Sequence, residues 1–190
     1  MELPVTLGQE PVDKEILEGE TRLMNIFYLH PDPLTAAEMH CDKHCVKMIL
    51  ETAQMLCTAH RTLDGDEQAD KLGMYKTAHL NHPSTQWVRG SLLQYEWTYH
   101  LFKFLCDEYT YRFNKVHKTD AKLRKVLKTP PYALHLAFAP EEYTQPPQCM
   151  PDQYKVPDDA VKAYRNYYIG EKAYFAKWAY TRTPEWWTVH

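Results

Sequence analysis

Apolar residues recur at steps of three and four positions along two long stretches of the chain. This spacing predicts helices with one buried face. The first stretch covers residues 34–57 and has a possible break near residues 41–43. The second continues from Pro83 through Gly90 to Tyr109. Helix starts are expected at Asp32-Pro33 and at Pro83, because Asp caps a helix and Pro fits its first turn.

The remaining pattern predicts shorter elements. "MNIFYLHPDP" (24–33) is an apolar run stopped by prolines and indicates a short buried strand or extended segment. Residues 62–73 are polar and predict a loop, residues 119–128 a shorter helix, and residues 129–157 a long loop rich in proline. A last helix is expected from Asp158 or Asp159 through Trp178, followed by an aromatic end that packs on the body.

The expected fold is therefore mostly α: a single compact domain of four or five helices, with a short N-terminal strand and the long Pro-rich loop. Residues 24–190 would form this domain. Residues 1–23 would form an acidic N-terminal extension, with six acids against two bases. The rest of the chain carries 20 bases and 19 acids, so a basic groove remains compatible with a net charge of −3.

Cysteine count and hydropathy narrow the class of protein. Five cysteines are an odd number, and several of them fall within apolar helical patterns, which argues against a disulfide framework. Neither a secretion signal nor an apolar run long enough to span a membrane is visible. We expect a reduced, cytoplasmic protein without a membrane partner.

A polar row follows the second half of the first helical stretch. His44, Lys47, Glu51 and Gln54 are spaced so that they share one helix face. An ordinary solvated face with a Lys47–Glu51 pair explains this row. A catalytic row explains it too, with Glu51 as acid/base and His44 and Lys47 beside it. A third interpretation is zinc bound by His40 and His44, which needs further ligands; otherwise no cofactor is expected.

Two further motifs suit a nucleic-acid substrate. In "NHPSTQWVR" (81–89), Asn81, His82 and Arg89 would bind phosphate, although a helix cap and a surface Arg explain the same residues. In "EYTYRFNKVHK" (108–118), aromatic rings alternate with basic side chains. Tyr111, Arg112 and Lys115 would line a strand there, by base stacking and backbone contacts, unless they are only a solvated helix end.

Several motifs resemble an uncharacterised protein family of tailed phages, T4-like phages and cyanophages among them. They are "MNIFYLHPDPLTAA", "CDKHCVKMILETAQML", "NHPSTQWVR", "AYRNYYIGEKAYFAKW" and "TPEWW". This resemblance implies a phage origin but no activity.

"MNIFYLHP", "NHPSTQWVR" and "DEYTYRFNKVH" also resemble pyrimidine-dimer DNA glycosylases of the endonuclease V type. That resemblance implies a compact α protein whose N-terminal α-amine attacks the sugar carbon with the help of a helix-borne Glu. Glu51 would stand for this Glu. Because 23 residues precede Met24, the nucleophile would instead be Lys47, or a water oriented by a carboxylate.

The sequence thus leads to a phage-encoded enzyme that acts on DNA bases in the host cytoplasm, most plausibly by glycosylase-like cleavage of the N-glycosidic bond. Two alternatives stay open. One is a base-modifying transferase or nucleotide hydrolase. The other is a non-enzymatic protein that binds a host factor or a host defence protein through its acidic extension.

Overall fold

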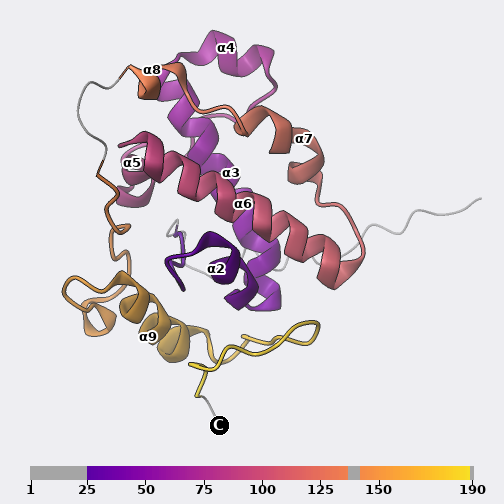
Figure 1. Ribbon diagram of the computed structural model, residues 1–190, viewed down its shortest axis with the longest axis vertical. Helices are drawn as coiled ribbons and strands as arrows, with labels where there is room; N and C mark the ends of the chain where they lie inside the picture. Colours follow the sequence, from indigo (N-terminus) through magenta and orange to yellow (C-terminus); the bar gives the residue numbers. More distant parts are fainter. Residues whose placement is uncertain (1–24, 137–141, 189–190) are drawn as a thin grey trace, which may run out of the picture.

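The structure is a computed structural model that describes residues 25–136 and 142–188. The predicted acidic extension, residues 1–23, lies outside this part of the chain. Two long helices, α3 (Asp42–Leu63) and α6 (Leu92–Phe113), pack against each other at the centre (Figure 1). Around them lie α2 (Pro33–Met39), α4 (Asp66–Lys71), α5 (Pro83–Val88), α7 (Lys118–Leu127), α8 (Tyr132–His135), a 3-10 turn (Asp152–Tyr154) and α9 (Ala160–Lys172).

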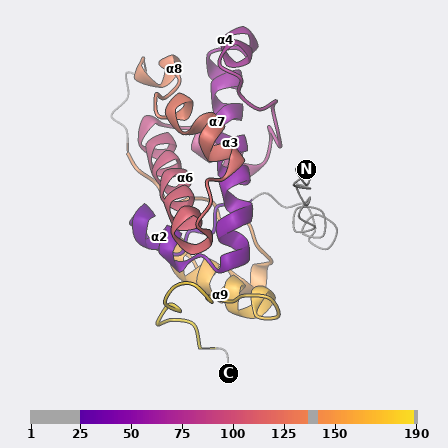
Figure 2. The same ribbon diagram turned by 90° about the vertical axis from the view of Figure 1, so that its right-hand side faces the viewer.

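The helices are arranged along α3. At one end of α3 lie α4 and α8, and at the other end lies α9 (Figure 2). The core forms where α3, α6 and α7 bury their apolar faces, with Met48, Leu56, Phe102, Leu105, Leu123 and Leu127 all fully buried. The mostly helical fold predicted from the sequence is confirmed. No helix among the described residues combines the length and apolar character needed to cross a membrane.

The helix boundaries confirm some expectations. Asp32 caps α2 by accepting a hydrogen bond from Thr35 N at 2.8 Å. The possible break in the first stretch falls at His40 and Cys41, which separate α2 from α3 with extended backbone. The long Pro-rich loop expected at 129–157 is confirmed for residues 142–157, where a 3-10 turn is the one regular element, but its first part contains the short helix α8.

The continuous helix expected through Gly90 is wrong. The helix is interrupted between Val88 and Leu92. Ser91 caps α6 by accepting a hydrogen bond from the backbone N of Gln94. A Cβ atom at Gly90 would lie 2.7 Å from Oε1 of Gln94, so this close approach suits glycine. This break, together with the two short helices α4 and α8, gives the described chain more helices than the four or five expected.

Two other expected elements differ as well. The polar loop expected at 62–73 contains α4, because Arg61 draws Asp66 and Asp70 onto its guanidinium at 2.7 and 2.6 Å. The last helix ends at Lys172 rather than at Trp178. Trp178 instead donates from its indole to the carbonyl of Met39, which docks the C-terminal segment on α2.

The short N-terminal strand is also wrong for the described residues. The segment from Asn25 to Leu29 is buried as expected, but it is neither strand nor helix, and Phe27 has a φ of 52°. No neighbouring strand is available to pair with it among the residues described here. Its polar backbone groups are therefore satisfied by side chains, a feature that shapes the site below.

Arg112 joins three helices from a fully buried position. Its guanidinium donates to Glu108 Oε2 at 2.8 Å and to the carbonyls of His40 and Glu38 at 2.7 and 3.0 Å. It also lies 3.2 Å from Oδ1 of Asp42. These contacts link the end of α6 to the α2–α3 junction, where the helix-end carbonyls lack partners within their own helices.

Replacing Arg112 by Met should destabilise the protein by about 3–5 kcal/mol, because two carboxylates and two carbonyls lose their partner. Arg112→Lys should recover only part of this loss, since an ammonium cannot reproduce the planar set of donors. Urea unfolding followed by circular dichroism measures both. Arg182→Met is the control, because its pair with Glu185 is exposed. Equal losses for Arg112→Met and Arg182→Met would contradict the assignment.

Candidate functional site

The polar row on α3 divides into two kinds of environment. Lys47 and Glu51 form an i,i+4 ion pair with Nζ and Oε1 3.6 Å apart. Their side chains are 21% and 16% exposed, so the pair is partly shielded from solvent yet open to it. His44, one turn earlier, is fully buried and faces the core. The helix therefore presents an amine and a carboxylate together at its surface, with the imidazole behind them.

Glu51 also contacts the beginning of the described chain. The backbone N of Asn25 donates to Oε2 of Glu51 at 3.3 Å. The Asn25 side chain folds back, and its Oδ1 accepts from the backbone N atoms of Ile26 and Phe27. This local turn holds the Asn25 backbone N in position against the carboxylate.

A loop that is distant in sequence completes the cluster. Nδ2 of Asn25 donates to the carbonyl of Cys149 at 3.0 Å, and the Cys149 thiol lies 3.4 Å from the hydroxyl of Ser84 on α5. The backbone N of Ser84 in turn donates to Nδ1 of His82 at 3.2 Å. Through these contacts, Glu51 and His82 belong to one connected cluster built from α3, the N-terminal segment, the long loop and α5.

His82 is half-buried at the start of α5. Burial lowers the pKa of its imidazole, and the nearby His79 lowers it further. A neutral imidazole accepts the Ser84 hydrogen bond with Nδ1 and leaves a proton on Nε2 for donation.

Asn81 and Arg89, the other two residues predicted to bind phosphate, flank the segment from His82 to Val88. Asn81 is exposed. Arg89 is half-buried and donates to the carbonyl of Leu80 at 2.8 Å, which braces the turn between residues 80 and 89. Its other terminal nitrogen is buried without a hydrogen-bond partner among the described residues, and burial lowers the pKa of the guanidinium.

The predicted strand-binding residues do not share one environment. Tyr111 is 73% exposed and Lys115 is exposed, so both face solvent near the end of α6. Arg112 points the other way, into the ion-pair network with Asp42 and Glu108. Its guanidinium is turned away from the surface on which Tyr111 and Lys115 lie.

Sequence patterns did not single out Asn25, Ser84 or Cys149. Asn25 and Cys149 are 124 positions apart, and neither has helical spacing to the polar row. The position of Asn25 at the start of the first motif shared with the glycosylases was the one available signal.

Comparison with known proteins decides the family. The sequence model of the family described as pyrimidine dimer DNA glycosylase matches residues 24–121. The chain belongs to this family. No curated protein and no solved structure matches the chain. The matched region contains Lys47, Glu51 and His82, whereas Cys149 and α9 lie beyond it.

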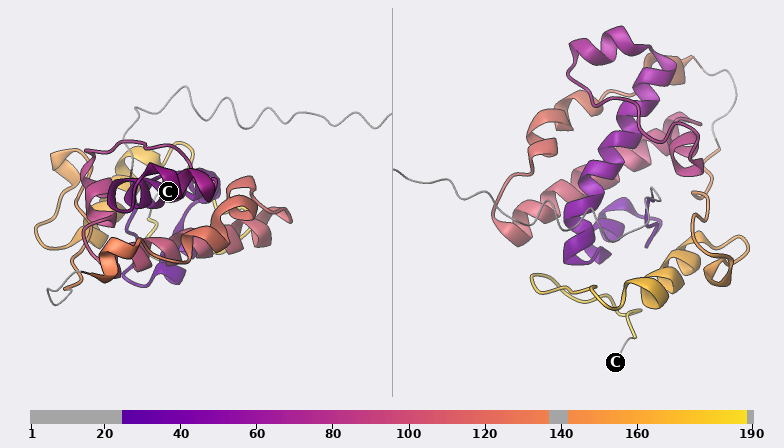
Figure 3. Two further views of the ribbon diagram at one scale, coloured as in Figure 1. Left: turned by 90° about the horizontal axis from the view of Figure 1, so that it is seen from above. Right: turned by 180° about the vertical axis from the view of Figure 1, so that it is seen from behind.

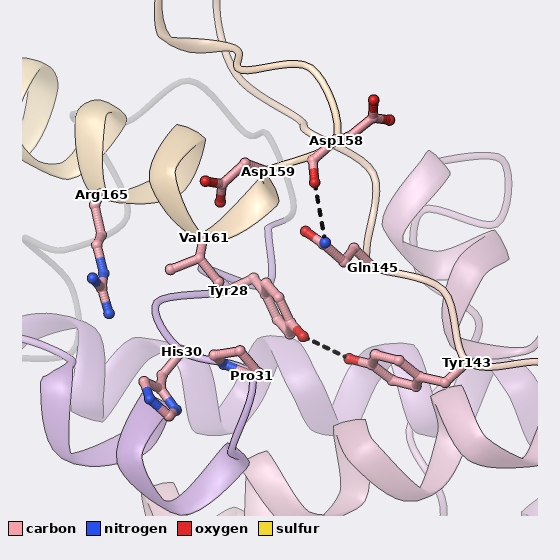
Figure 4. A pocket seen from close by; sticks show the side chains of 9 residues that line it. All are labelled: Tyr28, His30, Pro31, Tyr143, Gln145, Asp158, Asp159, Val161 and Arg165. Atoms are coloured by element: carbon pink, nitrogen blue, oxygen red, sulfur yellow. Dashed lines mark hydrogen bonds between the residues drawn. The ribbon is translucent and has the colours of Figure 1, made fainter.

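The chain also has a pocket apart from the Glu51 cluster. It lies between the N-terminal segment, the long loop and α9 (Figure 4). The hydroxyls of Tyr28 and Tyr143 meet there at 3.1 Å, and Val161 and Arg165 line it from α9. Arg165 is oriented by a hydrogen bond to the carbonyl of Leu29. Asp158 and Asp159 add two carboxylates to its wall, and neither Lys47 nor Glu51 lines it, so this pocket is distinct from the carboxylate–amine cluster.

The two histidines considered for zinc are both fully buried. Nδ1 of His40 lies 2.6 Å from the carbonyl of Ala36, and Nδ1 of His44 lies 2.6 Å from the hydroxyl of Tyr168. Across the described ranges, no three His, Cys, Asp or Glu side chains form a group that could hold a metal ion. The zinc alternative therefore gains no support from this geometry.

Buried histidines make stability depend on pH. Burial lowers the pKa of His40 and of His60 to about 4, and that of His44 well below the ordinary 6.5. In the unfolded chain these imidazoles take up protons near pH 6.5, while the folded protein keeps them neutral. The stabilisation they give is therefore complete above pH 6.5 and is lost as pH falls towards 4.

We expect the free energy of unfolding to fall by about 1.4 kcal/mol per pH unit for each such histidine below pH 6.5. Urea unfolding at several pH values between 7.5 and 4.5 measures this slope. His60→Gln should make the slope shallower, whereas His100→Gln, at an exposed position on α6, should not. A stability that stays flat from pH 7.5 to 4.5 would refute the prediction.

Proposed function

We propose that this protein cleaves the N-glycosidic bond of pyrimidine dimers in DNA, with Glu51 as the acid/base. One observation carries the proposal: the carboxylate of Glu51 contacts both an amine, Nζ of Lys47, and the backbone N of Asn25. The resemblance to endonuclease V-type glycosylases implies an amine nucleophile working with a helix-borne Glu. Membership in the pyrimidine dimer DNA glycosylase family supports DNA as the substrate.

The chemistry follows from an amine beside a carboxylate. The neutral amine attacks C1′ of the damaged nucleotide, and a new C–N bond forms as the glycosidic bond breaks. The electron pair of the broken bond goes to the departing pyrimidine, which takes up a proton from water and stays joined to the other pyrimidine of the dimer. Glu51 accepts the proton that the amine loses and then donates it to the ring oxygen of the sugar as the ring opens to an imine.

Two nitrogen atoms are placed for this attack. Lys47 carries a primary amine in the chain as given. The backbone N of Asn25 is a peptide nitrogen while Met24 precedes it, and it would be an α-amine only in a chain that begins at Asn25. We assign the role of nucleophile to Lys47 in the full chain, and to the α-amine of Asn25 in a chain that begins at Asn25.

The substrate contacts in this proposal come from the neighbouring elements. Asn81, His82 and Arg89 would bind phosphate beside the cluster, and Tyr111 and Lys115 would contact the strand from the end of α6. Arg112 would support that surface from within, because its guanidinium holds α6 to the α2–α3 junction. His44 would support Lys47 and Glu51 from behind through its contact with Tyr168. The phage origin, the host cytoplasm and a host-protein partner stay predictions from the sequence.

Glu51→Gln should lower base release from ultraviolet-irradiated duplex DNA, measured after photoreversal of the dimers frees the cleaved pyrimidine, by about 10²-fold or more, the usual contribution of a general acid/base. Lys47→Met tests the amine in the same assay. The matched control is the exposed i,i+4 pair Glu67–Lys71 on α4, substituted as Glu67→Gln and Lys71→Met, which should leave base release unchanged. Full activity in Glu51→Gln would exclude Glu51 as the acid/base.

Borohydride should trap the full chain on irradiated DNA as a covalent adduct, because it reduces the imine to a stable amine. Peptide mapping should place the adduct on Lys47, and Lys47→Met should abolish it. In a chain beginning at Asn25, the adduct should move to the N-terminal residue. Base release without any adduct would mean that the nucleophile is a water molecule oriented by Glu51, and not an amine.

A further inference from the structure

A row of basic side chains follows α7 and the turn before it. Five lysines lie between residues 115 and 128, and all five are exposed; we call them the lysine ridge: Lys115, Lys118, Lys122, Lys125 and Lys128. From 114 to 128 the sequence holds these five lysines and Arg124 against one acid, Asp120, although the whole chain carries −3. Positive charge is therefore concentrated on one element of a weakly acidic protein.

The three ridge lysines within α7 share one face of the helix. Lys118, Lys122 and Lys125 are spaced i, i+4 and i+7, so their side chains project from the same side. The opposite face carries Leu123 and Leu127, which are fully buried in the core. Packing of the leucines fixes the direction of the lysines towards solvent.

Among the described residues, the acids closest in sequence to Lys118, Lys125 and Lys128 are paired elsewhere or lie apart from them. Asp120 is occupied by Arg124, whose guanidinium also contacts Asp107 at 2.6 Å. Lys118, Lys125 and Lys128 form no ion pair with any residue that the structure describes. Like charges at i,i+3 and i,i+4 destabilise a helix, so the spacing of Lys118, Lys122 and Lys125 opposes local stability.

The ridge is connected to the helix that carries Glu51. Nζ of Lys122 lies over the ring of Tyr75 at 4.6 Å, and the carbonyl of Tyr75 accepts from Nε of Arg61 on α3 at 2.6 Å. Seen from behind, α3 runs through the centre and α7 lies at its side (Figure 3, right). A long ligand that crosses α3 on this side can therefore reach α7 as well.

We propose that the lysine ridge binds the phosphate backbone of the DNA duplex, beside the segment that occupies the Glu51 cluster. The inference rests on the proposed function for its partner. From Lys118 to Lys128 the helix rises about 15 Å, at 1.5 Å per residue. One strand of B-DNA has one phosphate for about every 3.4 Å of helix axis, so the ridge spans the axial rise of about four base pairs. An anionic membrane fits less well, because the apolar side chains of α7 are buried and cannot insert.

Salt dependence of binding to undamaged duplex DNA tests the ridge without requiring catalysis. The variant Lys118→Gln/Lys122→Gln/Lys125→Gln is compared with Lys155→Gln/Lys162→Gln/Lys177→Gln, three exposed lysines in the C-terminal part of the chain. Fluorescence anisotropy at stepwise NaCl concentrations gives the slope of log K against log[salt]. The ridge variant should reduce this slope by about 2–3, at roughly 0.9 per lost phosphate contact, and weaken binding by on the order of tenfold or more. The control variant should match the parent chain.

Urea unfolding controls for folding defects in the ridge variant. The ridge variant should unfold at the same or a higher urea concentration than the parent, because it relieves repulsion between lysines. Equal salt slopes for the ridge and control variants would overturn the proposal. So would tight binding of the parent chain to phosphatidylserine vesicles with no salt-dependent binding to DNA. Neither result depends on base release, which tests the proposed function separately through Glu51→Gln.

Discussion

The buried segment from Asn25 to Leu29 is the constraint that organises the rest of this structure. It is not helical and has no strand partner within residues 25–136 and 142–188, yet its peptide groups lie in the interior, where an unsatisfied donor or acceptor is costly. Side chains from distant parts of the chain meet this need. Glu51 accepts from the N of Asn25, and Arg165 donates to the carbonyl of Leu29. The same requirement thus brings α3, α9 and the long loop around one segment.

This arrangement explains why the candidate site lies where it does. Asn25 uses its side chain twice, to close its own turn and to bind the Cys149 carbonyl, and its backbone N is left to face the Glu51 carboxylate. Ser84 and His82 then join through Cys149. The polar groups of the site are thereby held by packing and hydrogen bonds, as a preorganised site requires. In the wider molecule, buried Arg112 fixes the α2–α3 junction from which the polar row on α3 begins.

The arginines and lysines discussed above have different roles in this protein. Arg112 and Arg61 are withdrawn from solvent and hold helix ends and a short helix in place. The lysines of α7 are exposed, and their ammonium groups form no such hydrogen bonds with the part of the chain that the structure describes. Arginine suits the first role because its planar guanidinium makes several directed hydrogen bonds at once, and lysine suits the second because its compact charge remains hydrated until a phosphate replaces the water. The sequence motif around Tyr111, Arg112 and Lys115 combines both roles within five residues.

Local patterns by themselves determined the helices whose apolar faces repeat regularly, together with the Asp32 cap and the i,i+4 spacing of the Lys47–Glu51 pair. These depend on neighbours within one or two turns, which the sequence displays directly. Only the tertiary structure decided that the long helix divides at Gly90, that Arg112 and His44 turn inward, and that Asn25, Ser84 and Cys149 join Glu51. Each of these depends on a contact between residues far apart in the chain, such as Asn25 with Cys149 or Arg112 with the His40 carbonyl. Periodicity reports which face of a helix is buried, but the identity of its partner is set by how the helices pack.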